Sequence, residues 1–223
     1  MSRGRVVSRR LLALFARRPE AGRVKTRLAP AIGAEQASVL YQAMLLDIAD
    51  QHARSDHDLA LWYTPEDAEP WFREHLPARY RLLAQRGPDL GSRMRVFFQV
   101  HGDEGYDRIV LRGTDSPSLP EERIQQAFAT LDEVDLVLCP DLDGGYNLIG
   151  LRAACDQIFD IPMSTASVLD QTLVLAERAG LRAQLLEPHH DVDTADDLER
   201  LAGDIDASRA PRTARLIRKK CPA

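Results

Sequence analysis

A basic loop near the start of this 223-residue sequence has the residue types that bind phosphate groups. It contains Gly22, Lys25 and Arg27, and it follows an apolar run at residues 11–16. Glycine lets a ligand approach the backbone closely, and the two cations can contact phosphoryl oxygens. The alternative is an ordinary solvated basic loop. We predict that Gly22, Lys25 and Arg27 bind the phosphates of a nucleotide, together with Arg17 at the edge of the same loop.

Two acidic motifs further along the chain could hold a divalent cation beside those phosphates. Asp115 lies in a Gly-Thr-Asp-Ser-Pro motif, and Asp191 and Asp193 lie in an Asp-Val-Asp-Thr motif. Mg²⁺ and Mn²⁺ prefer oxygen ligands and often take only one or two from the protein. The alternatives are an Asx-type turn at Asp115 and a helix N-terminus that favours acidic residues after Asp193. We predict Asp115 as one metal ligand, with either Asp191 or Asp193 as the second.

A glycine-rich segment, Asp143-Gly144-Gly145-Tyr146-Asn147, has the features of a second ligand-binding loop. Its glycines expose the backbone, Tyr146 offers a ring for stacking, and Asp143 and Asn147 can form hydrogen bonds with a polar ligand. Asp-Gly between two strands is also a strong hairpin signal, and the two interpretations are compatible. We predict that Gly144, Gly145, Tyr146 and Asn147 bind the acceptor and that Asp143 orients or deprotonates it.

A weaker signal lies at Gly91 and Arg93, where a turn leads into an expected helix. Backbone amides at a helix N-terminus favour anionic ligands. We predict that Gly91 approaches the base or ribose of a nucleotide and that Arg93 reaches a phosphate.

Apolar runs alternate with amphipathic segments along the chain, and this pattern predicts an α/β fold. Such a fold has a Rossmann-like, mainly parallel sheet with helices on both faces, and ligands bind beyond the carboxyl ends of its strands. The motifs above should therefore share one rim. Strands are expected at residues 11–16, 59–63, 80–84, 109–111, 136–138 and 183–186, and helices at 34–54, 66–75, 92–101, 121–131, 164–179 and directly after Thr194, the expected N-cap.

Charge is distributed unevenly along the chain, whose net charge is −5. Residues 1–30 hold nine basic residues and one acidic residue, residues 209–223 hold six basic residues and no acidic one, and residues 31–208 hold 14 basic and 33 acidic residues. An acidic body argues against a nucleic-acid-binding face. We expect one nucleotide-binding domain over residues 1–208 and a solvated basic tail over residues 209–223.

Cysteine content and hydropathy bear on the compartment. The three cysteines have neither metal-ligand spacing nor an even count for a disulfide framework. No segment approaches the roughly 18 apolar residues of a membrane span. The apolar run at residues 11–16 is shorter than the roughly 7–15 residues typical of a signal peptide. We therefore expect a cytoplasmic protein without an integral membrane segment, and no sequence feature specifies an oligomeric state.

Taken in order, these motifs resemble those of the glycosyltransferase-A-like nucleotide-diphospho-sugar transferase superfamily. More narrowly, they resemble its DUF2064 branch, the radical-SAM/selenodomain-associated transferase 1 family. The resemblance implies a nucleotide and a divalent metal, Mg²⁺ or Mn²⁺, with Lys25 and Arg27 on the phosphates and Asp115 and Asp193 on the metal. It is carried by residues 15–30, 89–94, 113–119, 143–151 and 191–198.

The resemblance implies a metal-dependent transferase with a nucleotide donor and a small-molecule acceptor. The interpretation we favour is glycosyl transfer from a nucleoside-diphosphate sugar to a small hydroxylated acceptor. The alternative is nucleotidyl transfer from a nucleoside triphosphate to a small phosphorylated or hydroxylated metabolite, with release of pyrophosphate. The basic pair favours that alternative, as does Asp115-Ser116-Pro117, which offers a single carboxylate where glycosyltransferases of this fold commonly have an Asp-x-Asp motif. A non-catalytic nucleotide-binding module is a second alternative.

Overall fold

The computed structural model describes residues 9–163 and 165–218, in which strands and helices alternate as the hydropathy pattern predicts. The strands are β1 (Arg10–Arg17), β2 (Asp58–Thr64), β3 (Arg81–Ala84), β4 (Arg108–Arg112), β5 (Leu136–Pro140), β6 (Tyr146–Leu151) and β7 (Ala183–Leu185). The α-helices are α1 (Ala29–Ile32), α2 (Ala34–His52), α3 (Glu69–His75), α4 (Leu90–Asp103), α5 (Glu121–Thr130), α6 (Val168–Arg178), α7 (Ala195–Asp204) and α8 (Pro211–Arg218), with short 3₁₀ turns η1 (Glu66–Ala68) and η2 (Asp156–Phe159).

The strands form one seven-stranded sheet in the order β3-β2-β1-β4-β6-β5-β7. All neighbouring pairs are parallel except those of β6, which runs antiparallel to both β4 and β5. The expected mainly parallel, Rossmann-like sheet is therefore confirmed. Because β1 and β4 are parallel neighbours, the loops that follow them leave the sheet at the same edge.

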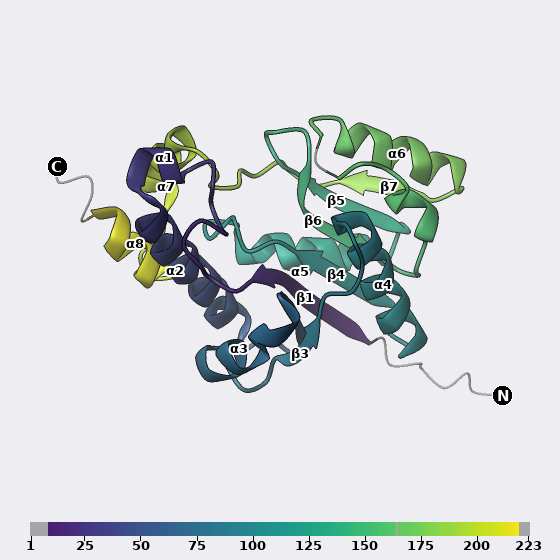
Figure 1. Cartoon of the computed structure of the whole chain (residues 1–223). Helices are drawn as coiled ribbons and strands as arrows, with labels where there is room; N and C mark the ends of the chain where they lie inside the picture. The colour runs from purple at the N-terminus through teal and green to yellow at the C-terminus, as the bar shows by residue number, and fades with distance from the viewer. Residues whose placement is uncertain (1–8, 164, 219–223) are drawn as a thin grey trace.

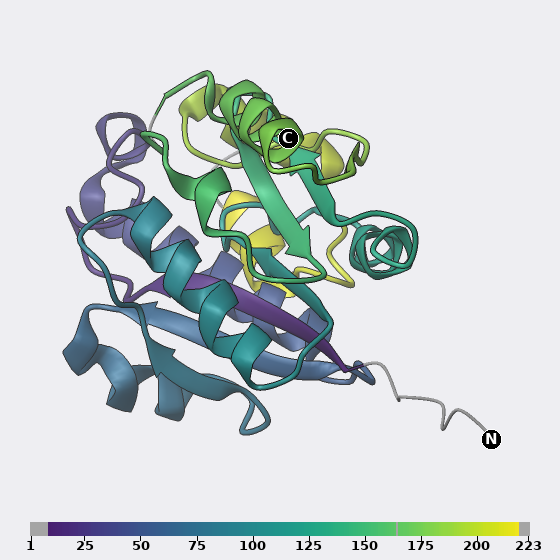
Figure 2. The ribbon, with the colours of Figure 1, turned by 90° about the vertical axis from the view of Figure 1, so that its right-hand side faces the viewer.

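Helices cover both faces of this sheet, as Figures 1 and 2 show. Successive side chains of β1 point to opposite faces: Leu12 and Leu14 pack in a core with α2, α3 and α5, whereas Leu11 and Ala13 pack in a core with α4 and α6. A strand that is apolar on both faces therefore lies between two layers of helices. This burial fixes β1 and holds the basic loop at its end in a defined place.

The glycine-rich segment forms a hairpin, so that interpretation of it is confirmed. It connects β5 to β6, and the N–H of Asp141 donates a 3.1 Å hydrogen bond to the carbonyl of Gly145. Gly144 has a φ of 89°, and a Cβ at this position would lie 2.0 Å from the carbonyl oxygen of Ala166. Only glycine fits this turn. The strand β6 was not among the expected strands.

The C-terminal residues differ from the expected solvated tail. Pro211–Arg218 form α8, which packs on α2 and buries Ile217. Asp47 of α2 accepts hydrogen bonds from the backbone N–H and the hydroxyl of Thr213, both at 2.8 Å, and an ion pair from Arg212. Figure 1 shows α1, α7 and α8 grouped at one end of α2. The remaining residues of the expected tail, 219–223, lie outside the described residues.

Helix α7 begins at the expected N-cap. The hydroxyl of Thr194 accepts a hydrogen bond from the N–H of Asp197, and the carboxylate of Asp197 accepts one from the N–H of Thr194. This reciprocal pair is a capping box with an acidic residue at its third position. It fixes the start of α7 directly after Asp193.

The expected start of α6 at Ser164 lies outside the described residues, and α6 begins at Val168. No helix in the described part of the chain is both long and apolar enough to cross a membrane.

We expect His57 to make stability depend on pH in the mildly acidic range. Its side chain is buried against Phe128, and burial lowers the pKa of His57 to about 4. In the unfolded chain His57 binds a proton near pH 6.5, whereas in the folded chain it binds one only near pH 4. The free energy of unfolding that is present above pH 6.5 is therefore lost as the pH falls toward 4. Urea unfolding measures the free energy of unfolding at pH 7 and at pH 5. Between these two values it should fall by roughly 1–2 kcal/mol less in His57→Leu than in the wild type. An identical fall in both proteins would contradict this assignment, and His75→Leu is the matched control on a partly exposed histidine.

Candidate functional site

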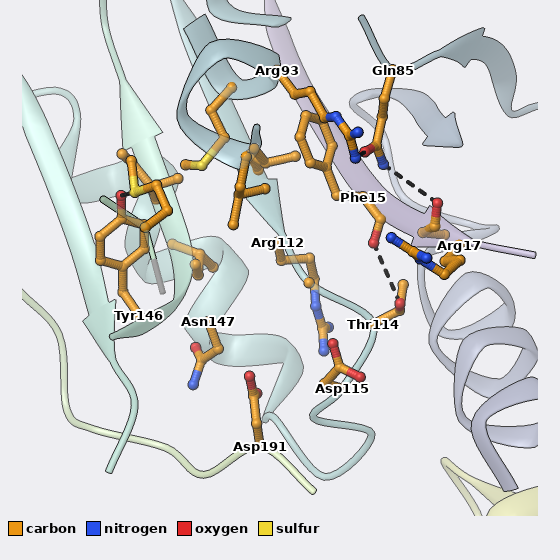
Figure 3. Close-up of a pocket in the computed structure, with 18 of the residues that line it drawn as sticks. Phe15, Arg17, Gln85, Arg93, Arg112, Thr114, Asp115, Tyr146, Asn147 and Asp191 are labelled. Atoms are coloured by element: carbon orange, nitrogen blue, oxygen red, sulfur yellow. Dashed lines mark hydrogen bonds between the residues drawn. The ribbon is translucent and has the colours of Figure 1, made fainter. Parts of the chain in front are cut away.

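A cavity of about 420 Å³ opens at the edge of the sheet where β1 and β4 end. Six of the residues expected in the site line it, namely Arg17, Arg93, Asp115, Tyr146, Asn147 and Asp191. Figure 3 shows these side chains arriving from separate elements around one space. Because the parallel strands bring their carboxyl ends together, residues about 130 positions apart in sequence meet at this rim.

Lys25 lies beside this cavity and joins three segments of the chain. Its side chain is 2% exposed, its backbone has a φ of 48°, and its ammonium contacts the carboxylate of Asp115 and lies 3.0 Å from Oδ1 of Asp193. Burial alone would lower the pKa of Lys25, but Asp115 and Asp193 raise it above its ordinary value. The ammonium is therefore charged at neutral pH, and the alternative of a solvated loop is wrong for this residue.

Arg27 reaches the same carboxylate from the solvent side. Its guanidinium contacts Asp193 and lies 3.9 Å from Oδ2 of Asp143, and its side chain is 59% exposed. The hydrogen bond that Arg27 donates to Asp193 and the charge of that carboxylate raise the pKa of Arg27. The two cations and the carboxylates of Asp115 and Asp193 thus form one cluster, in which the Lys25 contacts are buried and the Arg27 contact is exposed.

The two candidate second ligands, Asp191 and Asp193, differ in position. Asp191 lines the cavity, and its Oδ1 is buried without a hydrogen-bond partner among the described residues, whereas Asp193 pairs with the basic loop. The N–H of Asp191 donates to Oδ1 of Asp141 at 3.0 Å. Burial, and then the charges of Asp115 and Asp141, raise the pKa of Asp191 well above its usual range. Asp191 is therefore a half-buried acidic group that lines the cavity, with its Oδ1 atom buried.

Arg112 is a site residue that the sequence analysis missed. It ends β4, is 1% exposed and lines the cavity. Its guanidinium donates a 2.8 Å hydrogen bond to the carbonyl of Ser116 and another, at 3.1 Å, to Nε2 of His52. Because arginine only donates, His52 must carry its proton on Nδ1, which lies 3.0 Å from Glu121. Burial lowers the pKa of Arg112 to about 10. This network holds the segment around Asp115 from behind.

Tyr41 and Thr114 connect the ends of β1 and β4 by a chain of hydrogen bonds. The backbone N–H of Arg17 donates to the Tyr41 hydroxyl at 3.0 Å, that hydroxyl lies 3.0 Å from the Thr114 hydroxyl, and the Thr114 hydroxyl donates to the carbonyl of Phe15 at 3.3 Å. Burial raises the pKa of Tyr41 to about 12, so the phenol stays protonated. From the sequence, Tyr41 is predicted only as one residue of the apolar face of the helix at residues 34–54.

The glycines expected to contact ligand lie outside the residues that line the cavity. A Cβ on Gly91 would lie 2.8 Å from the carbonyl oxygen of Phe159, so this glycine permits close packing of α4. Gly22 adopts a φ of 74°, and Gly145 donates its N–H to Oδ1 of Asp143 at 3.1 Å. Asp143 therefore braces its own hairpin, and with Gly144 it lies beside the cavity rather than in its lining.

The oxygen atoms at this rim fit a hard divalent cation. Asp115 and Asp193 converge on one ammonium, and Oδ1 of Asp191 and Oδ1 of Asn147 are buried without hydrogen-bond partners among the described residues. No group of three His, Cys, Asp or Glu side chains within the described ranges could hold a metal on its own. Mg²⁺ and Mn²⁺ fit such a donor set, because they commonly keep waters or phosphate oxygens as their other ligands.

Replacing Lys25 should destabilise the protein more than replacing Arg27. In Lys25→Met, two partly buried carboxylates lose their shared cation, and we expect a loss of roughly 2–3 kcal/mol in the free energy of unfolding, less than for a fully buried pair. In Arg27→Met, an exposed contact is lost, and the expected change is below about 1 kcal/mol. Urea unfolding at pH 7 measures both. Equal losses in the free energy of unfolding of the two variants would show that the burial of Lys25 adds nothing to the stability of its ion pairs.

Comparisons with known proteins agree with this fold. Residues 47–165 match the model of a family described as "Uncharacterized protein conserved in bacteria (DUF2064)". No curated protein matches the chain. A crystal structure of a candidate nucleotide-diphospho-sugar transferase from Desulfovibrio desulfuricans G20 is 36% identical, with a TM-score of 0.88 over 95% of this chain and 98% of that one.

More distant structures share the fold. CMP:2-keto-3-deoxy-manno-octonic acid synthetase complexed with CTP is 11% identical, with a TM-score of 0.54 over 87% of this chain and 97% of that one. Rv0371c from Mycobacterium tuberculosis H37Rv, in complex with manganese, is 19% identical, with a TM-score of 0.52 over 89% of this chain and 100% of that one. The nucleotide-diphospho-sugar transferase fold expected from the sequence is thereby confirmed.

Proposed function

The chain belongs to the DUF2064 family, and we propose that it is a metal-dependent transferase that takes its donor group from an activated nucleotide. The observation that carries this proposal is the cluster of Lys25, Asp115 and Asp193 at the carboxyl ends of β1 and β4. In an open α/β sheet this edge is where ligands bind. A cavity of about 420 Å³ next to the cluster offers space for a nucleotide and a small acceptor.

Asp115 and Asp193 are the residues that would hold the cation, Mg²⁺ or Mn²⁺. A bound cation supplies charge neutralisation for the phosphate oxygens of the donor. Manganese is present in a structure of the distant relative Rv0371c, which supports this choice of metal. Lys25 and Arg27 provide fixed positive charge at the same place, and preorganised charge of this kind is often the largest catalytic contribution.

Two reactions fit this arrangement. Glycosyl transfer from a nucleoside-diphosphate sugar is our first candidate, because the relative that is 36% identical is named for nucleotide-diphospho-sugar transfer. Nucleotidyl transfer from a nucleoside triphosphate is the second. The Lys25–Arg27 pair and the single carboxylate of the Gly-Thr-Asp-Ser-Pro motif support it, as does the CTP bound by a synthetase of the same fold.

Product analysis separates the two reactions. The protein is incubated with Mg²⁺, each nucleoside triphosphate or nucleoside-diphosphate sugar, and a mixture of small hydroxylated and phosphorylated acceptors. Release of a nucleoside diphosphate supports glycosyl transfer, and release of pyrophosphate supports nucleotidyl transfer. Asp115→Asn and chelation by EDTA should each abolish the release while circular dichroism stays unchanged. Turnover that survives both treatments would contradict the proposed site, and no turnover with any donor would favour a binding module.

Asp191 is a better candidate than Asp143 for orienting or deprotonating the acceptor hydroxyl. Asp191 lines the cavity beside Asn147, whereas Asp143 is engaged with its own hairpin. We expect Asp191→Asn to lower kcat by about 10²–10⁴-fold, the usual range for general acid–base catalysis, and Asp143→Asn to leave kcat within about threefold. Steady-state kinetics on both variants test this assignment. The reverse order of effects would return the role to Asp143.

A further inference from the structure

The end of the cavity away from Asp115 is built from Phe15, Gln85 and Arg93. Figure 3 shows these three side chains together at one end and Asp115 and Asp191 at the other. If the phosphates of a nucleotide lie at the acidic and basic cluster, its base extends toward Phe15. The ring of Phe15 is held edge-to-face by Phe97 at 5.6 Å, so its orientation is fixed. This end therefore has the aromatic surface that a base needs.

Every N–H group of Gln85 already donates a hydrogen bond within the protein, so none is free for a ligand. Its Nε2 donates to the carbonyl of Trp62 at 2.8 Å and to the carbonyl of Ala16 at 3.3 Å, and its backbone N–H donates to the carbonyl of Tyr63 at 2.8 Å. This bonding orients Oε1 of Gln85 toward Arg93, whose Nη1 lies 3.5 Å away. Gln85 acts on the ligand through Arg93 and is a positioning residue.

Arg93 is held in place but still has donors to spare. Its Nε donates to the carbonyl of Gly87 at 3.0 Å, and no ion pair joins Arg93 to a carboxylate among the described residues. A guanidinium has five N–H donors and no acceptor. Only one or two of them are used by Gly87 and Gln85, so the ligand atoms that meet Arg93 must be hydrogen-bond acceptors.

Building on the proposed function, we propose that Arg93 binds the acceptor edge of the nucleotide base, so that the site selects guanine, cytosine or uracil over adenine. Guanine presents O6 and N7 side by side, and a planar arginine fork binds such a pair with two hydrogen bonds. Cytosine and uracil also present carbonyl oxygens. Adenine has no such acceptor pair, because N7 and N1 each lie beside the amino group, and this donor would face the donors of Arg93, whereas cytosine has N3 beside its carbonyl oxygen. The donor substrate is thus a nucleotide whose base carries a carbonyl group.

Calorimetry with ATP, GTP, CTP and UTP in the presence of Mg²⁺ tests this selectivity. At least one of GTP, CTP and UTP should bind wild-type protein about 5–150-fold more tightly than ATP, the range for one bidentate base contact. In Arg93→Met, the best of them and ATP should bind within about twofold of each other. Arg95→Met is the matched control, because Arg95 lies on the same helix, pairs with Asp160 and does not line the cavity. It should keep the wild-type preference.

Inorganic pyrophosphate serves as the probe for a phosphate contact, because it has no base. Its affinity should be the same for wild-type protein and Arg93→Met. If Arg93→Met bound pyrophosphate more weakly than the wild type, or lost affinity equally for all four nucleotides, Arg93 would be a phosphate contact. Either result would overturn the inference. Binding of ATP to wild-type protein as tightly as the best of GTP, CTP and UTP would overturn it too. Failure of all four nucleotides to bind would instead refute the proposed function itself, and circular dichroism of each variant confirms that it is folded.

Discussion

The ammonium of Lys25, buried between the carboxylates of Asp115 and Asp193, is the contact on which the architecture of this site depends. Each partner comes from a different part of the chain: the loop after β1, the loop after β4 and the segment before α7. Burying the ammonium alone would be costly, and it becomes tolerable because both carboxylates lie in direct contact with it. The ion cluster therefore requires all three segments to be in place together. The backbone adds a further tie, since the N–H of Val192 donates to the carbonyl of Asp115 at 2.9 Å.

Buried hydrogen bonds support this cluster from the side of the sheet. The Tyr41–Thr114 chain fixes the end of β1 against the segment that carries Asp115, and Arg112 fixes the same segment through the carbonyl of Ser116. These partners are buried, so a rearrangement of the segment would leave polar groups without hydrogen bonds. A site supported in this way keeps its charges in position before ligand arrives, which is the condition for strong electrostatic catalysis.

Sequence patterns predicted the fold more completely than the site, for a physical reason. The apolar run of β1 and the stripe of α2 report burial directly, because burial depends on the periodicity of each segment. The capping box at Thr194 is equally local and was predicted correctly. Strand β6 was missed because its partners, β4 and β5, are chosen by tertiary pairing. Helix α8 was missed because a basic run gives no sign of Asp47, the buried carboxylate that pairs with Arg212.

The same distinction applies within the site. Lys25, Arg27 and Asp115 could be proposed from the sequence because each stands in a short motif, and the motif spacing left Asp191 and Asp193 as alternatives. Side-chain direction separates them: one carboxylate faces the cavity and the other faces the basic loop.

Arg112, Tyr41 and Gln85 gave no local signal, because their roles come from partners distant in sequence. The order of the sheet explains how these roles divide. The parallel half, β3-β2-β1-β4, brings Gln85, Phe15 and Asp115 to one edge of the sheet, where all three line the cavity. The antiparallel strand β6 enters beside β4 with its N-terminal residues at that same edge, and so Tyr146 and Asn147 reach the far side of the cavity. A reversal of one strand thus gives the cavity a second wall, and the proposed acceptor residues lie on it, opposite the residues proposed to bind the nucleotide.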